Sequence, residues 1–148
     1  MHPTAARLAQ RLEERGLQIE VRTLTESART APLAAAALQV EVGQIVKSLV
    51  FLRDDQPVLV LCAGDRRVDA RRLGLSPATA DQVRAVTGFS IGGVPPLGHD
   101  DELTTMIDES LRRFGLVWAA AGTPHDVFRI GTEALIQAIP GARVTRVS

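Results

Sequence analysis

Cysteine and aromatic residues are scarce in this chain. It has one cysteine, Cys62, no tyrosine, and aromatic residues make up only 3% of its 148 residues. A single cysteine excludes an internal disulfide and fits a reducing compartment. Few aromatic rings argue against a stacking platform for single-stranded nucleic acid, because such platforms depend on base–aromatic stacking.

Net charge and long apolar runs are also lacking. Lys plus Arg and Asp plus Glu number 17 each, so no overall field attracts a polyanion, although a local basic patch stays open. No apolar run has the length of a membrane span, and the N-terminus lacks a signal-peptide pattern. We therefore expect a single cytoplasmic domain over residues 1–148, without membrane association. A hydrophobic content of 45% is enough for a core.

Hydrophobic periodicity predicts an α+β fold with interspersed helices and hairpin-like strand pairs. Helices are expected over residues 3–15, 30–38, 65–73, 79–87, 108–115 and 132–139. Strands are expected over residues 17–21, 45–52, 57–63, 103–108, 116–121, 127–130 and 143–147. Thr79 and Gln82 stand at capping-box spacing, and Thr132 is expected to cap the last helix.

Lys47 is the one charged residue in the apolar run 45–52. If this run is extended, Lys47 shares a face with Leu49 and Phe51. An ammonium in apolar surroundings is costly unless it reaches water or a polar partner. Lys47 is therefore either near a strand end with its amine in solvent, or a fixed cation lining a cleft.

Residues 87–99, T-G-F-S-I-G-G-V-P-P-L-G-H, hold four glycines and two prolines. This composition predicts a tightly shaped loop rather than a helix or strand. The loop is either a plain turn or a place where backbone N–H groups meet a ligand. A Walker-type phosphate loop is not supported because no Lys-Ser or Lys-Thr follows Gly98.

No familiar set of nucleophiles or metal ligands stands out. His99 and His125 lie beside carboxylates but have no second ligand at helical spacing, so we expect no metal site. Cys62 lies in an apolar run, where cysteine is usually a small buried hydrophobe. The pairs Arg66–Arg67 and Arg71–Arg72 form either a solvated helix face or a contact with phosphates.

Five segments occur in order along the chain: G-Q-I-V-K-S-L-V-F at 43–51, G-D-R-R-V-D-A-R-R-L at 64–73, T-G-F-S-I-G-G-V-P-P-L-G at 87–98, I-D-E-S-L at 107–111 and V-W-A-A-A-G at 117–122. Together they resemble the YbaK/ProX family of aminoacyl-tRNA editing domains. The most specific part of the resemblance is the lysine on an apolar strand combined with the later G-x-x-P-x-G element.

The resemblance implies a compact α+β domain with a mixed, mostly antiparallel, barrel-like sheet surrounded by helices. It implies hydrolysis of the ester of a mischarged tRNA, with tRNA for proline carrying Cys, Ala, Ser or Thr as the leading substrate. Because the chain contains no synthetase sequence, it would be a free-standing, trans-acting form. Prolyl-tRNA synthetase is a further candidate partner, and no cofactor is implied.

The expected site residues form a catalytic and a substrate-binding group: Lys47, Gly92, Gly93 and Gly98 in the first, and Ser48, Pro95, Pro96 and His125 in the second. His125 is not part of the resemblance: it precedes the strand 127–130 and either reaches the pocket or is a plain surface histidine. Backbone N–H groups of the loop would stabilise the developing oxyanion while a positioned water attacks. Lys47 would hold the terminal adenosine phosphate or the substrate carbonyl as a point charge.

Two positions depart from the family pattern. Ser48 stands where some subfamilies have asparagine, and Pro95 stands where a small polar residue is common. Both are expected to line the pocket, so the substrate of better-known members does not transfer to this chain. Two other functions stay open: a non-catalytic module that binds charged tRNA or a synthetase, and a hydrolase of another small activated ester or thioester.

Overall fold

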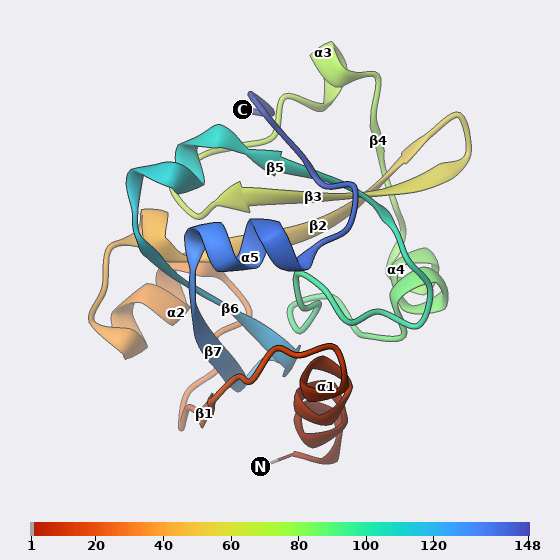
Figure 1. Ribbon diagram of the computed structural model, residues 1–148. Helices are drawn as coiled ribbons and strands as arrows, with labels where there is room; N and C mark the ends of the chain where they lie inside the picture. Colours follow the sequence, from red (N-terminus) through yellow and green to blue (C-terminus); the bar gives the residue numbers. More distant parts are fainter. Residues whose placement is uncertain (1) are drawn as a thin grey trace.

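Two open β-sheets form the framework of the computed structural model, which describes residues 2–148 (Figure 1). The larger sheet has the order β4-β2-β3-β5-β8 and the smaller one β1-β7-β6. The strands are β1 (Val21–Thr23), β2 (Val46–Arg53), β3 (Gln56–Ala63), β4 (Ser76–Pro77), β5 (Thr104–Asp108), β6 (Leu116–Thr123), β7 (Asp126–Gly131) and β8 (Arg143–Thr145).

The α+β class and the mixed, mostly antiparallel sheet are confirmed. Within residues 2–148, four strand pairs are antiparallel and two, β3–β5 and β5–β8, are parallel. The barrel-like closure is wrong, because each sheet keeps its own edge strands. The two sheets meet through an isolated bridge between Ile45 and Trp118.

Five α-helices and two short 3-10 helices complete the described part of the chain. They are α1 (Pro3–Glu14), α2 (Ala31–Leu38), α3 (Ala70–Leu73), α4 (Ala80–Thr87), α5 (Thr132–Ala138), η1 (Val42–Gln44) and η2 (Glu109–Arg113). The predicted capping box of α4 is confirmed, since Thr79 and Gln82 cap each other's backbone N–H groups at 3.2 and 2.8 Å.

Three local predictions were wrong. The segment 17–20 is not a strand, because β7 pairs only with Val21–Thr23. The helix expected from residue 65 begins at Ala70, where Asp69 accepts a hydrogen bond from the N–H of Arg72. Thr132 is the first residue of α5 rather than its cap, and its hydroxyl donates to the carbonyl of Phe114 at 2.5 Å.

The β2–β3 hairpin lies at the centre of the molecule, as the two apolar runs predict. Leu61 of β3 is fully buried with Leu12 of α1, Phe128 of β7 and Leu135 of α5 in one cluster. A second cluster packs the alanine face of α2 against Ile45. Burying a side chain of this size stabilises the fold by about 1.5–3 kcal/mol. The packing fixes β2 and the start of α2 beside each other.

Candidate active site

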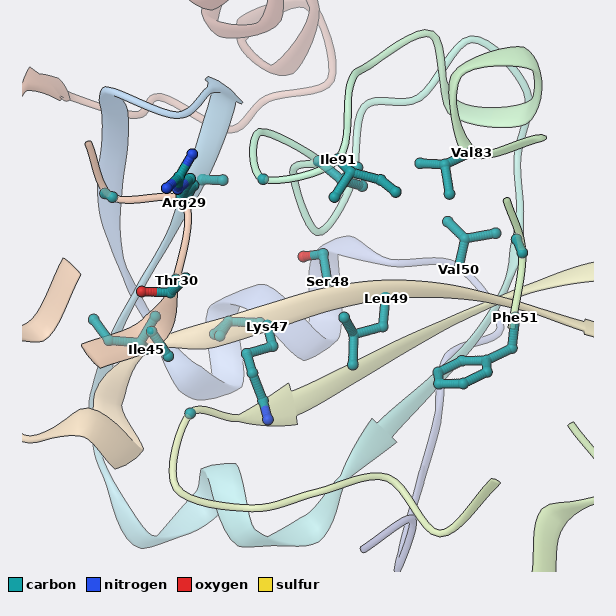
Figure 2. A pocket seen from close by; sticks show the side chains of 18 of the residues that line it. Arg29, Thr30, Ile45, Lys47, Ser48, Leu49, Val50, Phe51, Val83 and Ile91 are labelled. Carbon is teal, nitrogen blue, oxygen red and sulfur yellow. The ribbon is translucent and has the colours of Figure 1, made fainter. Parts of the chain in front are cut away.

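A pocket of about 540 Å³ lies along the free edge of β2 (Figure 2). This volume falls within the range of about 300–1,000 Å³ typical of small-molecule sites. Strand β4 pairs with the same edge at Phe51 and Leu52, and the N–H of Ala78 donates to the carbonyl of Val50 at 3.4 Å. Residues 46–49 are left open. The walls come from the start of α2, β2, the end of β3, α4 and the glycine-rich loop: Ala28–Pro32, Ile45–Phe51, Gly64, Pro77, Ala78, Val83, Ile91, Gly92, Val94 and Ala120.

The two faces of β2 give the pocket two unlike ends. Ser48 and Val50 point toward Ile91 and Val83, whereas Lys47, Leu49 and Phe51 point to the opposite side of the strand (Figure 2). This is the alternation that an extended run predicts. One end of the pocket is therefore formed by Ser48 and the loop, and the other lies beside the Lys47 side chain.

The Lys47 ammonium donates a hydrogen bond to the carbonyl oxygen of Arg66. Its side chain is half-buried, lies near the start of β2 and borders the pocket, so it has the strand-end position of the first interpretation and the cleft-side position of the second. The ammonium points away from the Gly92 loop and toward the segment that follows β3 (Figure 2). The charge thus lies at the end of the pocket that Gly64 lines.

A network of polar contacts holds the segment that accepts the Lys47 hydrogen bond. Asp65 receives two hydrogen bonds from the Arg113 guanidinium, at 2.9 and 2.7 Å, and Arg113 also donates to the carbonyl of Ser110 at 2.7 Å. The hydrogen bond from Arg113 is the main reason that the pKa of Asp65 lies below its usual value. We call the Asp65–Arg113 pair the clamp.

Two glycines allow this arrangement by close approach. A Cβ at Gly64 would collide with the carbonyl oxygen of Val42, and a Cβ at Gly43 would lie 2.9 Å from the Phe114 ring. Arg113 lies over the same ring, 5.0 Å from its centroid. Both glycines belong to the quoted segments around 43–51 and 64–73. Gly43 leaves room for Phe114 and the Arg113 guanidinium, and Gly64 lets the end of β3 pack closely against Val42.

The hydroxyl oxygen of Ser48 is buried and has no hydrogen-bond partner in residues 2–148. It is directed into the pocket, toward the loop that carries Ile91 (Figure 2). Leaving a buried polar group unpaired costs about 1–3 kcal/mol. Such a group in a pocket is suited to a ligand that completes its hydrogen bonds.

The glycine-rich loop presents only part of its predicted surface to the pocket. Gly92 lines the pocket, and its N–H has no acceptor within residues 2–148. Gly92 has φ +90° and forms a turn in which the N–H of Gly93 donates to the carbonyl of Ser90 at 3.0 Å. That amide is already used. A Cβ at Gly93 would also meet the carbonyl of Gly122 at 2.8 Å.

Four other predicted residues lie outside the pocket lining. Pro95, Pro96 and Gly98 are buried on the far side of the loop, where Gly98 packs against Leu8 and Leu12 of α1. His125 lies in the exposed turn before β7, with Nδ1 3.3 Å from the carbonyl oxygen of Leu24. The structure therefore brings Lys47, Ser48 and Gly92 together in the lining of one pocket. The other five predicted residues do not line it.

The chemistry open to the pocket is defined by its charged and polar groups. Among the lining residues of the described chain, the charged ones are Lys47 and Arg29, and there is no Asp, Glu, His or Cys. Cys62 is fully buried next to Lys47 in the hairpin register. Burial raises the pKa of its thiol to about 11, so it does not form a thiolate nucleophile at neutral pH. The pocket is suited to anions and developing negative charge.

Residues 2–148 bring no three His, Cys, Asp or Glu side chains together in a geometry that would hold a metal ion. No helix in that range combines the length and apolar character needed to cross a membrane. His99 is half-buried: burial lowers its pKa, and its Nε2 lies 2.7 Å from the carbonyl oxygen of Pro95.

Sequence reasoning missed Arg29 and Thr30, which line the pocket at the start of α2. Thr30 is visible in the sequence as an N-cap, and its hydroxyl accepts from the N–H of Leu33 at 3.4 Å. Nothing in the pattern around Arg29 distinguishes it from other surface arginines. Only the folded structure shows its position beside the glycine-rich loop: a Cβ added at Gly92 would lie 3.1 Å from the Cβ of Arg29.

The α+β fold, the lysine-bearing strand and the glycine-rich loop are all present, as the resemblance to aminoacyl-tRNA editing domains implies. Residues 25–138 match the family model of the aminoacyl-tRNA editing domain. The chain belongs to that family.

Individual relatives agree with the family. The uncharacterized protein YwhH of Bacillus subtilis is 33% identical over 128 residues, with 78% of each chain covered. The proline–tRNA ligase of Lactobacillus gasseri is 36% identical over 85 residues, and the match covers 53% of this chain but only 15% of the ligase. A crystal structure of a candidate trans-editing enzyme for prolyl-tRNA synthetase superimposes with a TM-score of 0.91 at 44% identity, covering 100% of this chain and 98% of that one.

Proposed function

We propose that this protein is a trans-acting deacylase that hydrolyses the ester between a wrong amino acid and the 3′ end of a tRNA. The observation that carries the proposal is the pocket itself: it joins an unpaired hydroxyl and a free amide at one end to a fixed ammonium at the other, without a carboxylate, imidazole or thiol. Such a site suits an ester that is already activated and needs no protein nucleophile.

The reaction balances with water as the only co-reactant. The water oxygen attacks the ester carbonyl carbon, and the carbonyl oxygen becomes negatively charged. The bond to the ribose oxygen then breaks, and that oxygen takes up the proton that the attacking water has lost. The products are the free amino acid and a tRNA with its terminal hydroxyl restored. Stabilising the oxyanion and positioning the water are the contributions that the protein must make.

The two unlike ends of the pocket support a proposed orientation of the substrate. The aminoacyl group lies at the Ser48 and Gly92 end, where the free N–H of Gly92 faces the carbonyl oxygen and the Ser48 hydroxyl contacts the amino acid. The Lys47 ammonium lies at the opposite end, which favours its role as a holder of the terminal phosphate. The predicted roles of Gly93, Pro95, Pro96, Gly98 and His125 stay predictions.

The lining of the pocket and the relatives of the chain support the proposed substrate class. Ser48 is small and polar, and the rest of the lining is mainly apolar, which fits a small wrong amino acid such as Cys, Ala, Ser or Thr. The relation to proline–tRNA ligases and to a candidate trans-editing enzyme supports tRNA for proline as the carrier. Prolyl-tRNA synthetase itself is a further proposed partner.

The test is a deacylation panel in which tRNA for proline carries Cys, Ala, Ser, Thr or Pro. We expect release of at least one small wrong amino acid well above the spontaneous rate, and slower release of Pro. If no ester is turned over but charged tRNA binds, the protein is a non-catalytic binding module. If a small activated ester or thioester is hydrolysed without any tRNA binding, the tRNA assignment is wrong.

A further inference from the structure

The segment 64–72 begins at the Lys47 end of the pocket and exposes several arginines. Gly64 lines the pocket, and the carbonyl of Arg66 accepts the hydrogen bond from Lys47. The side chains of Arg66, Arg67 and Arg71 are exposed to solvent. We call these three residues the arginine ridge.

The acidic residues of the same segment are already neutralised. Asp65 pairs with Arg113 at 2.7 Å and Asp69 pairs with Arg72 at 3.4 Å. Within residues 2–148, no carboxylate lies within 4.0 Å of the charged groups of Arg66, Arg67 or Arg71. The ridge therefore carries three positive charges without an ion-pair partner in residues 2–148, on a segment that contacts the Lys47 ammonium through the Arg66 carbonyl, in a chain whose formal net charge is zero.

The chemistry of the proposed substrate indicates what these charges meet. In an aminoacyl ester the amino acid's carboxylate is consumed by the ester bond, so the only anions of the substrate are the phosphates of the RNA. Contacts between Arg or Lys and phosphates supply most of the sequence-independent affinity for nucleic acid. A row of free cations that starts at one end of the pocket fits a backbone that leaves the pocket there.

We propose that the arginine ridge binds the phosphates of the acceptor strand, so that the RNA leaves the pocket past Lys47, Arg66 and Arg67. The inference rests on the proposed function and adds the direction of the substrate to it. The aminoacyl group points to Ser48 and Gly92, and the RNA backbone runs over the segment 64–72. Because the ridge contacts phosphates, its binding is independent of the base sequence of the RNA.

The experiment measures binding of uncharged tRNA for proline by fluorescence anisotropy, as a function of salt. The variant Arg66→Ala/Arg67→Ala/Arg71→Ala loses three charges, so the slope of log K against log[salt] falls in magnitude by about 2, at roughly 0.7 per single-strand phosphate. Affinity at 0.1 M salt falls about tenfold or more. The triple Arg→Lys variant keeps the charges and is expected to keep the wild-type slope.

The control variant is Arg7→Ala/Arg22→Ala, which removes two exposed arginines without ion-pair partners in residues 2–148. They lie on α1 and β1, at the opposite end of the molecule from α3 (Figure 1). In this control, the change in the slope of log K against log[salt] per charge removed is expected to be close to zero. Folding of every variant is checked by thermal unfolding.

Any one of three results would contradict the proposal that the arginine ridge binds the RNA phosphates. The alanine variant keeps the wild-type slope, the control loses as much slope per charge as the ridge, or the wild-type protein binds no tRNA and instead binds an acidic protein. Binding of uncharged tRNA needs no turnover, so a protein that binds through the ridge but hydrolyses nothing would contradict the proposed deacylase alone.

Discussion

At the scale of a single residue, we expect the unpaired hydroxyl of Ser48 to contribute to deacylation and not to the stability of the fold. Because its oxygen has no partner in residues 2–148, replacing Ser48 by Ala removes an unsatisfied polar atom and keeps nearly the same volume. We expect the free energy of unfolding to stay the same or rise slightly. We expect kcat/KM for the best mischarged tRNA to fall about tenfold, as one lost hydrogen bond of about 1.4 kcal/mol predicts.

The measurements are urea unfolding and steady-state deacylation on the same preparations. Ser48→Asn gives the residue found in some subfamilies and is expected to change the order of preference in the amino acid panel. A loss of more than about 1 kcal/mol of stability in Ser48→Ala would mean that the hydroxyl is structural, contrary to its unpaired state.

Single residues show where sequence reasoning reaches its limit. Lys47 could be predicted because a charge in an apolar strand needs a special partner, and the structure supplies the Arg66 carbonyl. Gly92 could be predicted from the composition of its loop, but composition does not say which side of a loop faces a cleft. Gly93 and Gly98 have the same signal as Gly92, yet they pack against β6 and α1.

At the scale of elements, the position of the Lys47 charge depends on the clamp between the segment after β3 and the end of η2. Asp65→Asn removes the charge that Arg113 grips, so the segment carrying the Arg66 carbonyl loosens. The pair is about one third exposed, and such pairs contribute only about 0–1 kcal/mol to stability. We expect little change in the unfolding free energy and a fall in kcat/KM of about tenfold.

A neighbouring ion pair gives the matched control. Arg112 also donates two hydrogen bonds to a carboxylate, that of Glu133, at 3.1 and 3.2 Å, and neither residue lines the pocket. Arg112→Ala should leave deacylation near the wild-type rate. Equal losses in Asp65→Asn and Arg112→Ala would show that the clamp does not position Lys47. Recovery of activity in the exchanged pair Asp65→Arg/Arg113→Asp would support it.

Elements with strong local signals could be predicted from the sequence. The β2–β3 hairpin and the capped helices α2 and α4 have apolar runs or caps that need no distant partner. The short strands β1, β4 and β8 depend on the strand beside which they happen to lie. Their bounds could not be derived from local patterns, because pairing over long sequence distances decides them.

At the scale of the whole molecule, Asp108 ties the end of the chain to the central sheet. Its buried carboxylate accepts hydrogen bonds from the N–H of Val147 at 2.8 Å, from the N–H of Ser148 at 3.2 Å, and from the hydroxyl of Ser110. Burial alone would raise the pKa of Asp108, but these hydrogen bonds outweigh it and hold the pKa below its usual value.

The lowered pKa of Asp108 predicts the pH dependence of stability. Its contribution is fully present above the unfolded-state pKa of about 3.9 and is lost as the pH falls through the lower folded-state value. Asp108→Asn is expected to cost about 1–3 kcal/mol at pH 7 and to weaken the fall in stability between pH 5 and pH 3. Urea unfolding at both pH values checks this, with Glu133→Gln as the exposed control. A variant as stable and as acid-sensitive as the wild type would contradict the tie.

The open sheets are the main feature of the whole molecule that the family resemblance described incorrectly. A closed barrel would require hydrogen-bonded pairing between edge strands of the two sheets. In the described chain, the isolated bridge between Ile45 and Trp118 is the one such link. The unpaired edge of β2 is what remains, and the pocket lies along it. An open edge is therefore the structural origin of the site.

The most direct test of the account is the single-turnover rate at which wild-type protein and Lys47→Ala release the amino acid that the panel identifies. The account predicts that the wild type exceeds the spontaneous rate and that Lys47→Ala loses most of this excess while it stays folded. A Lys47→Ala protein that deacylates as fast as the wild type would contradict the central claim that this pocket performs the hydrolysis with Lys47.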